Sequence, residues 1–452
     1  MKQKTQIAPA KADSSTSTSD RKSRSCGSLH YAVYMAPNVL RHCCQRFFVN
    51  GQRRGDAEMY PVNSDEDVDV DKILQSKRDL YEAINRGEET QCSGCPYLSD
   101  EEWPSLDKLE INNLSIESQT HCNARCSYCN ETYYGGLEPN YNLKATYYKF
   151  ASANVFSDDI SIVWGGGEPL LMKDFEKIFC LYTDNLRPKH NRVFSNAILY
   201  SPLLATYLKE RKIYLTTSID AGTKETFRKV RGVDGFETVL KNLSKYVIQS
   251  ISRVTIKYIL TEDNQDISEI NSFINELNRH GLSNCDFEIS ANYKVEEITS
   301  KRLSSVYNFY TALINNGASS VHFDDHLRKR LHYKITEIYD SYEKGIPVDK
   351  GLIDEISNFH GREVVVWGTG GYASELIENS IFFQKTKIAF FIDSNINKQG
   401  RYFKGKKIYS PDAVQHVDFP IVIASSMFWQ EIRSALESEG VSNERIVSSC
   451  IF

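Results

Sequence analysis

Long apolar runs and an excess of positive charge are both missing from this sequence of 452 residues. No stretch approaches the roughly 18 apolar residues that a membrane-spanning helix needs. The formal net charge is −5, so no global basic field exists that would attract nucleic acid. The N-terminus also lacks the apolar segment of a secretory signal. We therefore expect a cytoplasmic protein without a membrane or nucleic-acid partner.

Composition divides the chain into regions. Residues 1–25 are rich in Ser, Thr, Lys and Arg and nearly free of large apolar residues, which predicts a disordered tail. A cysteine-rich module is expected at 26–104 and a core domain at 105–300. A helical extension and linker at 301–355 then precede a second α/β domain at 356–452. The length allows two or three such domains.

Cysteine is scarce, with 11 residues in the whole chain, and it is unevenly distributed. Most of it falls into three groups at short spacing: the pair Cys43 and Cys44, the CxxC of Cys92 and Cys95, and the CxxxCxxC of Cys122, Cys126 and Cys129. Clusters of this kind in a long chain without a signal peptide indicate metal ligation in a reducing compartment, not disulfides.

Between Leu114 and Ser290 the hydrophobic pattern alternates between strand-like and helix-like runs. The six strand-like runs are residues 114–118, 160–164, 192–195, 213–218, 254–260 and 285–290. The clearest helix places Ile267, Ile270, Ile274 and Leu277 on one face. Alternation of this type predicts parallel strands with helical crossovers, either a partial (β/α)6 TIM-type barrel or an open sheet. In both arrangements ligands bind at the carboxyl ends of the strands.

The CxxxCxxC motif in "HCNARCSYC" directly follows the first of these strands and therefore lies in a strand-end loop. Three thiolates in one short loop can bind three corners of a cubane iron–sulfur cluster and leave the fourth iron open. Zinc suits the motif less well, because structural zinc sites usually have four ligands. The spacing alone leaves both metals possible.

The next strand ends in "WGGGEPL", which contains Gly165, Gly166, Gly167 and Glu168. Consecutive glycines at a strand end allow the backbone to approach a ligand closely. The Glu168 carboxylate is suited to an ammonium group. The alternative is an ordinary strand-to-helix turn with Pro169 at the first helical position.

Taken together, these two motifs resemble those of the radical S-adenosylmethionine (radical SAM) superfamily. Tyr128 before the third cysteine fits the same pattern, and three later segments follow its usual course. "FSNAIL" resembles the TNG segment with Asn196 at the Asn, although Ala197 replaces the Gly. "LTTSID" resembles the strand that bears Ser218 and Asp220, and "RKVRGVDGFETVLKNL" resembles the stretch after it. The resemblance covers roughly residues 114–290.

The resemblance implies an enzyme in which Cys122, Cys126 and Cys129 hold a [4Fe–4S] cluster. The open iron would chelate S-adenosylmethionine, and reductive cleavage would give a 5′-deoxyadenosyl radical that abstracts hydrogen from a substrate. A reductant such as flavodoxin or ferredoxin is implied as a partner. The substrate would be a small molecule, a sugar-linked molecule or a peptide, and the resemblance does not distinguish them.

Further site residues follow from the same resemblance. Gly166, Gly167 and Glu168 are expected at the cofactor amine, and Tyr128 near the adenine. Asn196, Ser218 and Asp220 are expected at the polar groups of the cofactor. Core packing is the alternative for Tyr128. Hydrogen bonding at the strand end is the alternative for Ser218 and Asp220.

The N-terminal cysteines resemble a SPASM-like or twitch-like module, which usually follows the core but here precedes it. We expect Cys92, Cys95 and one or both of Cys43 and Cys44 to be ligands, with Cys26 a poorer reserve. An auxiliary iron–sulfur cluster is the first interpretation. A zinc site and no metal at all are the alternatives.

The C-terminal region carries "VVVWGTGGYASELIE", in which Gly368, Gly370 and Ala373 form GxGxxA between a strand and a helix. Asp393 ends the next strand, where a ribose-binding acid is expected. This predicts a Rossmann-like domain that binds a nucleotide or, alternatively, serves for docking.

Two other functions remain open from the sequence. One is an NAD-dependent dehydrogenase with structural zinc sites. The other is a non-catalytic binding protein that docks a partner through the C-terminal domain.

Overall fold

A ten-stranded sheet dominates the computed structural model, which describes residues 22–129, 135–295, 297–346, 348, 350–425 and 428–447. The strand order is β14-β13-β12-β11-β10-β9-β8-β2-β3-β6, and pairing is parallel from β14 to β2. The parallel strands are β2 (Ala32–Met35), β8 (Ile111–Ile116), β9 (Phe156–Trp164), β10 (His190–Phe194), β11 (Tyr214–Ser218), β12 (Val254–Leu260), β13 (Asp286–Ala291) and β14 (Ser320–Phe323).

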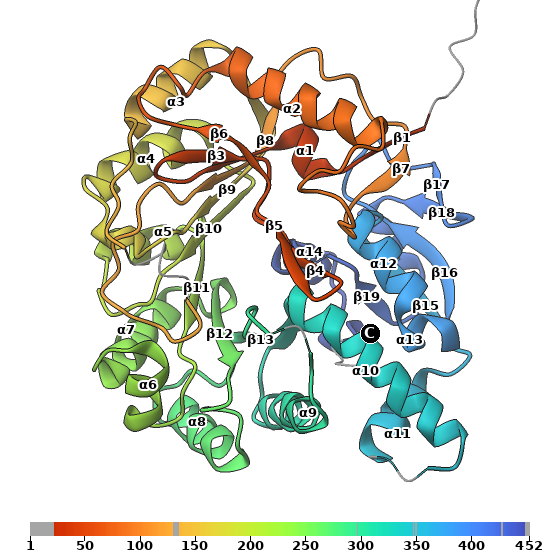
Figure 1. Ribbon diagram of the computed structural model, residues 1–452. Coiled ribbons are helices and arrows are strands. Elements are labelled where there is room, and N and C mark those ends of the chain that lie inside the picture. Colours follow the sequence, from red (N-terminus) through yellow and green to blue (C-terminus); the bar gives the residue numbers. More distant parts are fainter. Residues whose placement is uncertain are drawn as a thin grey trace, which may run out of the picture.

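Helices cover the outer face of this sheet, which curves into an open barrel (Figure 1). They are α3 (Leu143–Ser152), α4 (Phe175–Leu186), α5 (Pro202–Lys209), α6 (Lys224–Arg231), α7 (Phe236–Gln249), α8 (Ile267–Arg279), α9 (Ser300–Asn315) and α10 (Asp325–Glu343), with short 3-10 turns η2 (Pro169–Leu171) and η3 (Ile251–Arg253). The next helix, α11 (Lys350–Phe359), lies away from this sheet, beside α13 (Ile381–Lys385). The predicted partial TIM-type barrel is confirmed, and all six predicted strands are present as β8 to β13. The stretch 301–355, predicted to be helical, contains a further strand, β14. That strand was missed because its four residues are too few for a visible alternation.

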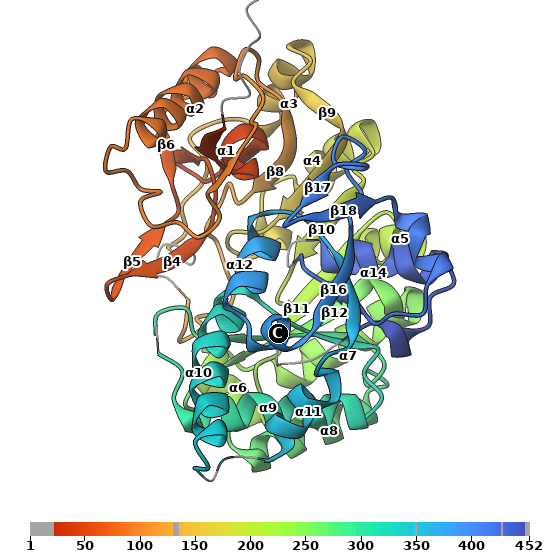
Figure 2. The same ribbon diagram turned by 90° about the vertical axis from the view of Figure 1, so that its right-hand side faces the viewer.

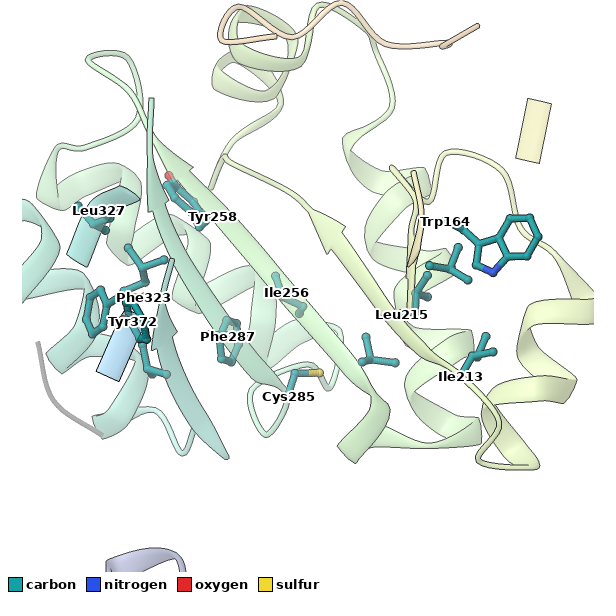
Figure 3. Packing of buried hydrophobic residues seen from close by; sticks show 14 of the residues in the cluster. Trp164, Ile213, Leu215, Ile256, Tyr258, Cys285, Phe287, Phe323, Leu327 and Tyr372 are labelled. Carbon is teal, nitrogen blue, oxygen red and sulfur yellow. The ribbon is translucent and has the colours of Figure 1, made fainter. Parts of the chain in front are cut away.

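Strand side chains alternate between the helices and the inside of the barrel. Ile256, Phe287 and Phe323 lie on neighbouring strands and are buried (Figure 3). Tyr258 packs against Phe273 of α8 at a ring-centroid distance of 5.0 Å. These residues therefore form the layer between sheet and helices, and their neighbours in sequence face the inside.

Helix α8 follows its predicted amphipathic pattern with one exception. Ile270 and Leu277 are buried together with Phe273. Ile267 was predicted on the same face but is 55% exposed. It is the first residue of the helix and lies beyond the edge of the sheet that its later turns cover.

The N-terminal region builds onto the barrel edge. Its remaining elements are β1 (Ser23–Ser25), α1 (Gly27–Tyr31), β3 (Val39–Arg41), β4 (Arg46–Val49), β5 (Gln52–Gly55), β6 (Glu58–Pro61), α2 (Val70–Asn85) and β7 (Ser99–Glu101). β2 pairs with β8, and the hairpin of β4 and β5 projects away from the sheet (Figure 2). Ser23–Ser25, which falls within the predicted tail, forms β1 and pairs with β7. Residues 1–21 lie outside the described residues.

The C-terminal region forms a second, five-stranded sheet of order β17-β18-β16-β15-β19. Its elements are β15 (Glu363–Trp367), α12 (Gly371–Asn379), α13 (Ile381–Lys385), β16 (Lys387–Ile392), β17 (Tyr402–Phe403), β18 (Lys406–Tyr409), η4 (Pro411–His416), β19 (Ile421–Ile423), α14 (Trp429–Ser438) and η5 (Asn443–Arg445). The parallel strands β18, β16, β15 and β19 stand in the order of the first four strands of a dinucleotide-binding sheet. The Rossmann-like assignment stays a prediction.

Helix α14 joins this second sheet to the amino ends of the barrel strands. Arg433 pairs with Asp286 at the start of β13, and both side chains are buried. Gln430 accepts a hydrogen bond from Arg192 of β10 at 2.9 Å. Trp429 stacks on His322 of β14 at 4.6 Å. The C-terminal region therefore covers one end of the barrel, opposite the carboxyl ends at which ligands are expected.

Arg433→Met removes the cation that faces Asp286. We expect the free energy of unfolding to fall by about 3–5 kcal/mol, because a buried charge is left unpaired. Chemical denaturation followed by circular dichroism measures this. Arg401→Met, at an exposed position of the same region, is the control. Adding Asp286→Asn to Arg433→Met should recover part of the loss, and a loss no larger than that of the control would contradict the prediction.

Candidate active site

The CxxxCxxC cysteines lie in the loop that follows β8. Cys122, Cys126 and Cys129 are half-buried, and none of them forms a disulfide. Burial raises the pKa of the Cys122 thiol above its usual value. The loop continues into residues 130–134, which lie outside the described residues. Three cysteines outside any disulfide thus lie in the loop that follows the strand β8, as the motif predicts.

Helix α6 holds one side of this loop through main-chain hydrogen bonds. The N–H of Arg125 donates to the carbonyl of Arg231 at 2.8 Å, and the N–H of Ser127 donates to the carbonyl of Val230 at 2.8 Å. Gly232 ends the helix with φ +66°, and a Cβ there would lie 2.3 Å from the Arg125 carbonyl oxygen. The last carbonyls of α6 therefore find their partners in the cysteine loop.

The glycine-rich turn after β9 holds the other side of the loop. The Gly167 N–H donates to the Gln119 carbonyl at 3.0 Å, and the Glu168 N–H donates to the His121 carbonyl at 2.7 Å. A Cβ on Gly167 would lie 2.2 Å from the His121 carbonyl oxygen, and one on Gly166 would lie 2.7 Å from that of Gln119. These glycines leave room for the cysteine loop itself, a role that sequence reasoning missed.

Glu168 is 1% exposed, and its carboxylate accepts hydrogen bonds within the protein. The donors are Ser195 Oγ at 2.9 Å, the Asn196 N–H at 2.7 Å and the Leu170 N–H at 3.2 Å. Burial raises the pKa of Glu168, and these hydrogen bonds partly offset the effect. The carboxylate joins the turns after β9 and β10. The predicted contact of Glu168 with the cofactor amine stays a prediction.

Asn196 lies at the junction of these loops. Its Nδ2 donates to Asn123 Oδ1 at 2.6 Å and lies 3.8 Å from Cys122 Sγ. The following Ala197 has φ +54°, in the left-handed region that costs a non-glycine residue about 1–2 kcal/mol. The turn keeps the backbone shape that a glycine would adopt freely, and Asn242 Nδ2 donates to the Ala197 carbonyl at 2.9 Å.

Tyr128, Asp220 and Arg231 form a buried cluster beneath the cysteine loop. Tyr128 donates to Asp220 Oδ2 at 2.6 Å, and Arg231 pairs with the same oxygen at 2.8 Å. Asp220 Oδ1 accepts from the Ile259 N–H at 2.6 Å. Both oxygens of Asp220 are thus used inside the protein. Its predicted role at the ribose, like that of Tyr128 at the adenine, stays a prediction.

Sequence reasoning missed Arg231. It belongs to the "RKVRG" segment that was noted only as a continuing resemblance. Two signals could have identified it: Asp220 at a buried strand end needs a cation, and Gly232 marks the helix end where that cation stands.

A row of polar side chains crosses the inside of the barrel near the same end. On neighbouring parallel strands, Ser218 lies opposite Lys257, Lys257 lies opposite Glu288, and Glu288 lies opposite His322. Lys257 Nζ lies 2.5 Å from Glu288 Oε1 and 3.7 Å from Asp324 Oδ2. Burial opposes the charged form of Lys257, but these carboxylates raise its pKa above its usual value. The row offers both signs of charge to a ligand beside the cysteine loop.

The donor set of the cysteine loop fits an iron–sulfur cluster. Arg125 and Lys294 donate to carbonyls of the loop, including that of Cys129 at 2.8 Å from Lys294, so cations border the thiols. In the described ranges no group of three or more His, Cys, Asp or Glu side chains is placed to hold one metal ion. A cubane cluster requires a wider arrangement of ligands than a single metal ion, because each thiolate binds a separate iron.

The pKa shifts of the N-terminal thiols link Cys26, which was expected only as a reserve ligand, with Cys92 and Cys95. Cys26, Cys43, Cys92 and Cys95 affect one another: burial raises the pKa of Cys92, and Cys43, Cys95 and Cys26 raise it further. Burial likewise raises the pKa of Cys95 to about 12, with Cys26 and Cys43 adding to the effect.

Cys44 is influenced mainly by other groups than these thiols. Burial raises its pKa to about 12, and its next neighbours are the Glu117 carboxylate, which raises the pKa, and the Tyr34 hydroxyl, which lowers it by hydrogen bonding. Glu117 follows β8 inside the barrel, and a Cβ on Gly165 would contact it at 3.6 Å. Cys43 packs with Cys92 and Cys95 in one hydrophobic cluster, and which N-terminal cysteines are ligands stays a prediction.

The GxGxxA turn of the C-terminal region is tightly packed. Gly368 has φ +119°, and a Cβ there would lie 2.6 Å from the Ala424 carbonyl oxygen. Nothing lies within 4 Å of a Cβ on Gly370, but one on Gly371 would lie 2.9 Å from the Tyr97 carbonyl oxygen. The N-terminal region therefore touches the start of α12.

Asp393 lies at the end of β16 as predicted, but its carboxylate already has partners. It accepts hydrogen bonds from the Thr369 hydroxyl and from the Asn395 N–H, and Lys398 Nζ lies 3.7 Å away. Nucleotide binding by Gly368, Gly370 and Asp393 stays a prediction.

Comparison with known proteins identifies two parts of the chain. Residues 116–274 match the radical SAM superfamily, and residues 361–447 match the family described as C2185-like, N-terminal. The GTP 3′,8-cyclase of Pasteurella multocida (strain Pm70) is 26% identical over 161 residues, covering 34% of this chain and 46% of that protein. The probable GTP 3′,8-cyclase of Methanocaldococcus jannaschii is 25% identical over 170 residues, covering 37% and 56%. The chain spans about half the length of these curated relatives.

Two solved structures illustrate the more distant similarity. Native anSMEcpe with bound AdoMet is 18% identical, with a TM-score of 0.34, covering 52% of this chain and 62% of that one. Streptococcus suis SuiB bound to the precursor peptide SuiA is 13% identical, with a TM-score of 0.38, covering 72% of each.

The chain therefore contains a radical SAM domain, and the predicted motifs from Cys122 to Asp220 all lie within it. The family match confirms the predicted enzyme class and the predicted need for a [4Fe–4S] cluster and S-adenosylmethionine. In the described part of the chain no helix has the length and apolar character needed to cross a membrane.

Gly167→Ala should displace the cysteine loop, because the new Cβ meets the His121 carbonyl in backbone that cannot move aside. We expect the iron bound after anaerobic reconstitution to fall by about four per chain. Gly165→Ala is the matched control, since its Cβ meets only the Glu117 side chain at 3.6 Å. Iron and sulfide analysis measures both variants, and equal iron in the two would contradict this role of Gly167.

Proposed function

We propose that this protein is a radical SAM enzyme that cleaves S-adenosylmethionine reductively and abstracts hydrogen from a polar organic substrate. The observation that carries the proposal is the loop of Cys122, Cys126 and Cys129, which main-chain hydrogen bonds hold between the glycine-rich turn and the end of α6. An ordinary strand-to-helix turn would not need glycines that leave room for a second loop.

The residues of the site have separate tasks in this proposal. Cys122, Cys126 and Cys129 would hold a [4Fe–4S] cluster, leaving one iron open for the methionine part of the cofactor. When bound, the cluster and S-adenosylmethionine supply a 5′-deoxyadenosyl radical. Asn196 and Ser218 would bind polar groups of the cofactor.

The buried groups act as positioning residues. Glu168 holds the turn after β10, and the cluster of Tyr128, Asp220 and Arg231 supports the loop from below.

Substrate would bind inside the barrel, over the row that contains Lys257 and Glu288. A charged pair of this kind suits a substrate with several polar groups, such as a small sugar-linked molecule, better than an apolar one. The similar proteins from Pasteurella multocida and Methanocaldococcus jannaschii are named for a reaction on GTP, which is also polar. A peptide is the second candidate substrate. A reductant such as flavodoxin or ferredoxin would supply the electron.

We also propose a second metal centre in the N-terminal region, with Cys26, Cys43, Cys92 and Cys95 as its ligands. Cys43 packs with Cys92 and Cys95 in one cluster, and Cys26 acts on the pKa of both Cys92 and Cys95, so four sulfurs are available to an iron–sulfur cluster. An iron–sulfur cluster is the form that we propose. The dehydrogenase alternative is less well supported, because Thr369 and Lys398 already engage Asp393.

Reconstituted anaerobically and given S-adenosylmethionine and dithionite, the protein should release 5′-deoxyadenosine. The triple variant Cys122→Ala, Cys126→Ala, Cys129→Ala should release no more than a blank without enzyme, because the open iron is lost. Liquid chromatography of the products measures the release. Cys180→Ala, outside both thiol groups, is the control and should retain activity. Release by the triple variant equal to that of the control would refute the proposal.

The vicinal cysteines test the second centre. Cys43→Ala and Cys26→Ala should each lower the iron content from about eight to about four per chain, whereas Cys44→Ala should leave about eight. Iron, zinc and sulfide are determined on the same reconstituted samples. Loss of iron in Cys44→Ala with full iron in Cys26→Ala would show that Cys44, and not Cys26, is a ligand of the second centre. Zinc in place of the second four irons would leave the ligands correct and the metal wrong.

A further inference from the structure

Lys77 is a buried cation in the N-terminal region. It lies on α2, is 0% exposed, and donates from Nζ to the carbonyls of Leu29 at 2.9 Å and Ala32 at 2.7 Å. Two carbonyls satisfy its hydrogen bonds but supply no negative charge. A buried ammonium without a counter-charge costs several kcal/mol, and such groups usually pair with an anion.

No carboxylate supplies that charge, because within the described ranges Lys77 forms no ion pair with Asp or Glu. The groups that act on its charge are thiols: burial lowers the pKa of Lys77 to about 7, and Cys26 and Cys43 oppose this shift. The imidazoles of His30 and His42 are buried nearby, and Lys77 helps to depress the pKa of each. Neither imidazole can supply negative charge to Lys77.

Hydrogen bonds of Lys77 and of its neighbour Ser76 tie α2 to the two chain segments that carry Cys26 and Cys43. Cys26 caps α1, its Sγ accepting from the Leu29 N–H at 3.4 Å, and Lys77 binds the carbonyl of the same Leu29. On the other side, His42, which precedes Cys43, contacts Ser76 at 3.3 Å, and Ser76 precedes Lys77. Lys77 is thus fixed between the two chain segments that carry Cys26 and Cys43.

The negative charge of an iron–sulfur cluster would explain why a buried lysine lies beside these cysteine-bearing segments. Four thiolates around an oxidised [4Fe–4S] core carry a net charge of −2, and a reduced core carries one more negative charge. A buried cation stabilises the more negative state most, because Coulomb energies are large where water is excluded. The net charge near a cluster is one of the main determinants of its reduction potential.

We propose that Lys77 is the counter-charge of the N-terminal centre formed by Cys26, Cys43, Cys92 and Cys95, and that it raises the reduction potential of that centre. This rests on the second centre of the proposed function. Lys77 acts here as a positioning and tuning residue, not as a ligand.

The test is a redox titration of the full-length reconstituted protein, followed by electron paramagnetic resonance. Lys77→Gln removes the charge but keeps an amide that can donate to the carbonyls, and Lys77→Met removes both. At the wild-type midpoint, the ratio of reduced to oxidised N-terminal centre should fall about tenfold in both variants, equal to about 59 mV for one electron. The signal of the Cys122, Cys126 and Cys129 cluster should not move.

Two further variants separate the charge of Lys77 from its packing. Lys72→Gln removes an exposed charge from the same helix, and it should leave both midpoints unchanged. Lys77→Arg keeps the charge and should stay near the wild-type midpoint. A purely structural role predicts that Met, but not Gln, changes the protein, so an unchanged midpoint in Lys77→Gln would overturn the proposal.

The same samples separate this proposal from the wider one. A protein that cleaves S-adenosylmethionine but has no redox-active N-terminal centre would overturn the role of Lys77 and leave the radical chemistry intact. A protein whose N-terminal midpoint shifts as expected but that releases no 5′-deoxyadenosine would support the role of Lys77 and refute the proposed radical chemistry.

Discussion

The main-chain hydrogen bonds that hold the cysteine loop are the constraint on which the site depends. One side of the loop bonds to the last carbonyls of α6 and the other to the turn after β9. Neither contact leaves room for a Cβ at Gly167 or Gly232. Because these bonds use backbone atoms, they fix the loop before any metal contributes. None of the three cysteines is used in a disulfide, so their sulfurs can serve as cluster ligands.

Much of this site was predictable, since its chemistry lies in short contiguous motifs. CxxxCxxC and GGGE identify the radical SAM domain, and the alternating pattern predicts β8 to β13 correctly. What the sequence could not predict are contacts between distant segments. Helix α14, for example, reaches the barrel through Arg433 and Asp286, which are 147 residues apart. No local periodicity records such pairs. The four-residue strand β14 was missed for a different reason, its shortness.

The roles of adjacent cysteines were also beyond sequence reasoning. Cys43 and Cys44 look equivalent in the sequence, and one or both were expected as ligands of one centre. In the structure Cys43 packs with Cys92 and Cys95, whereas the charged group that acts most on the pKa of Cys44 is Glu117. Cys26 stands alone in the sequence, its side chain caps α1, and its role as a ligand stays a proposal.

This divergence has a consequence for electron transfer. Consecutive Cα atoms are about 3.8 Å apart, so the proposed N-terminal centre and the inside of the barrel meet across one peptide bond between Cys43 and Cys44. Glu117, beside Cys44, adjoins the glycine-rich turn through Gly165. A buried cation that adjusts the potential of the N-terminal centre, as proposed for Lys77, would set how readily that centre gives up an electron.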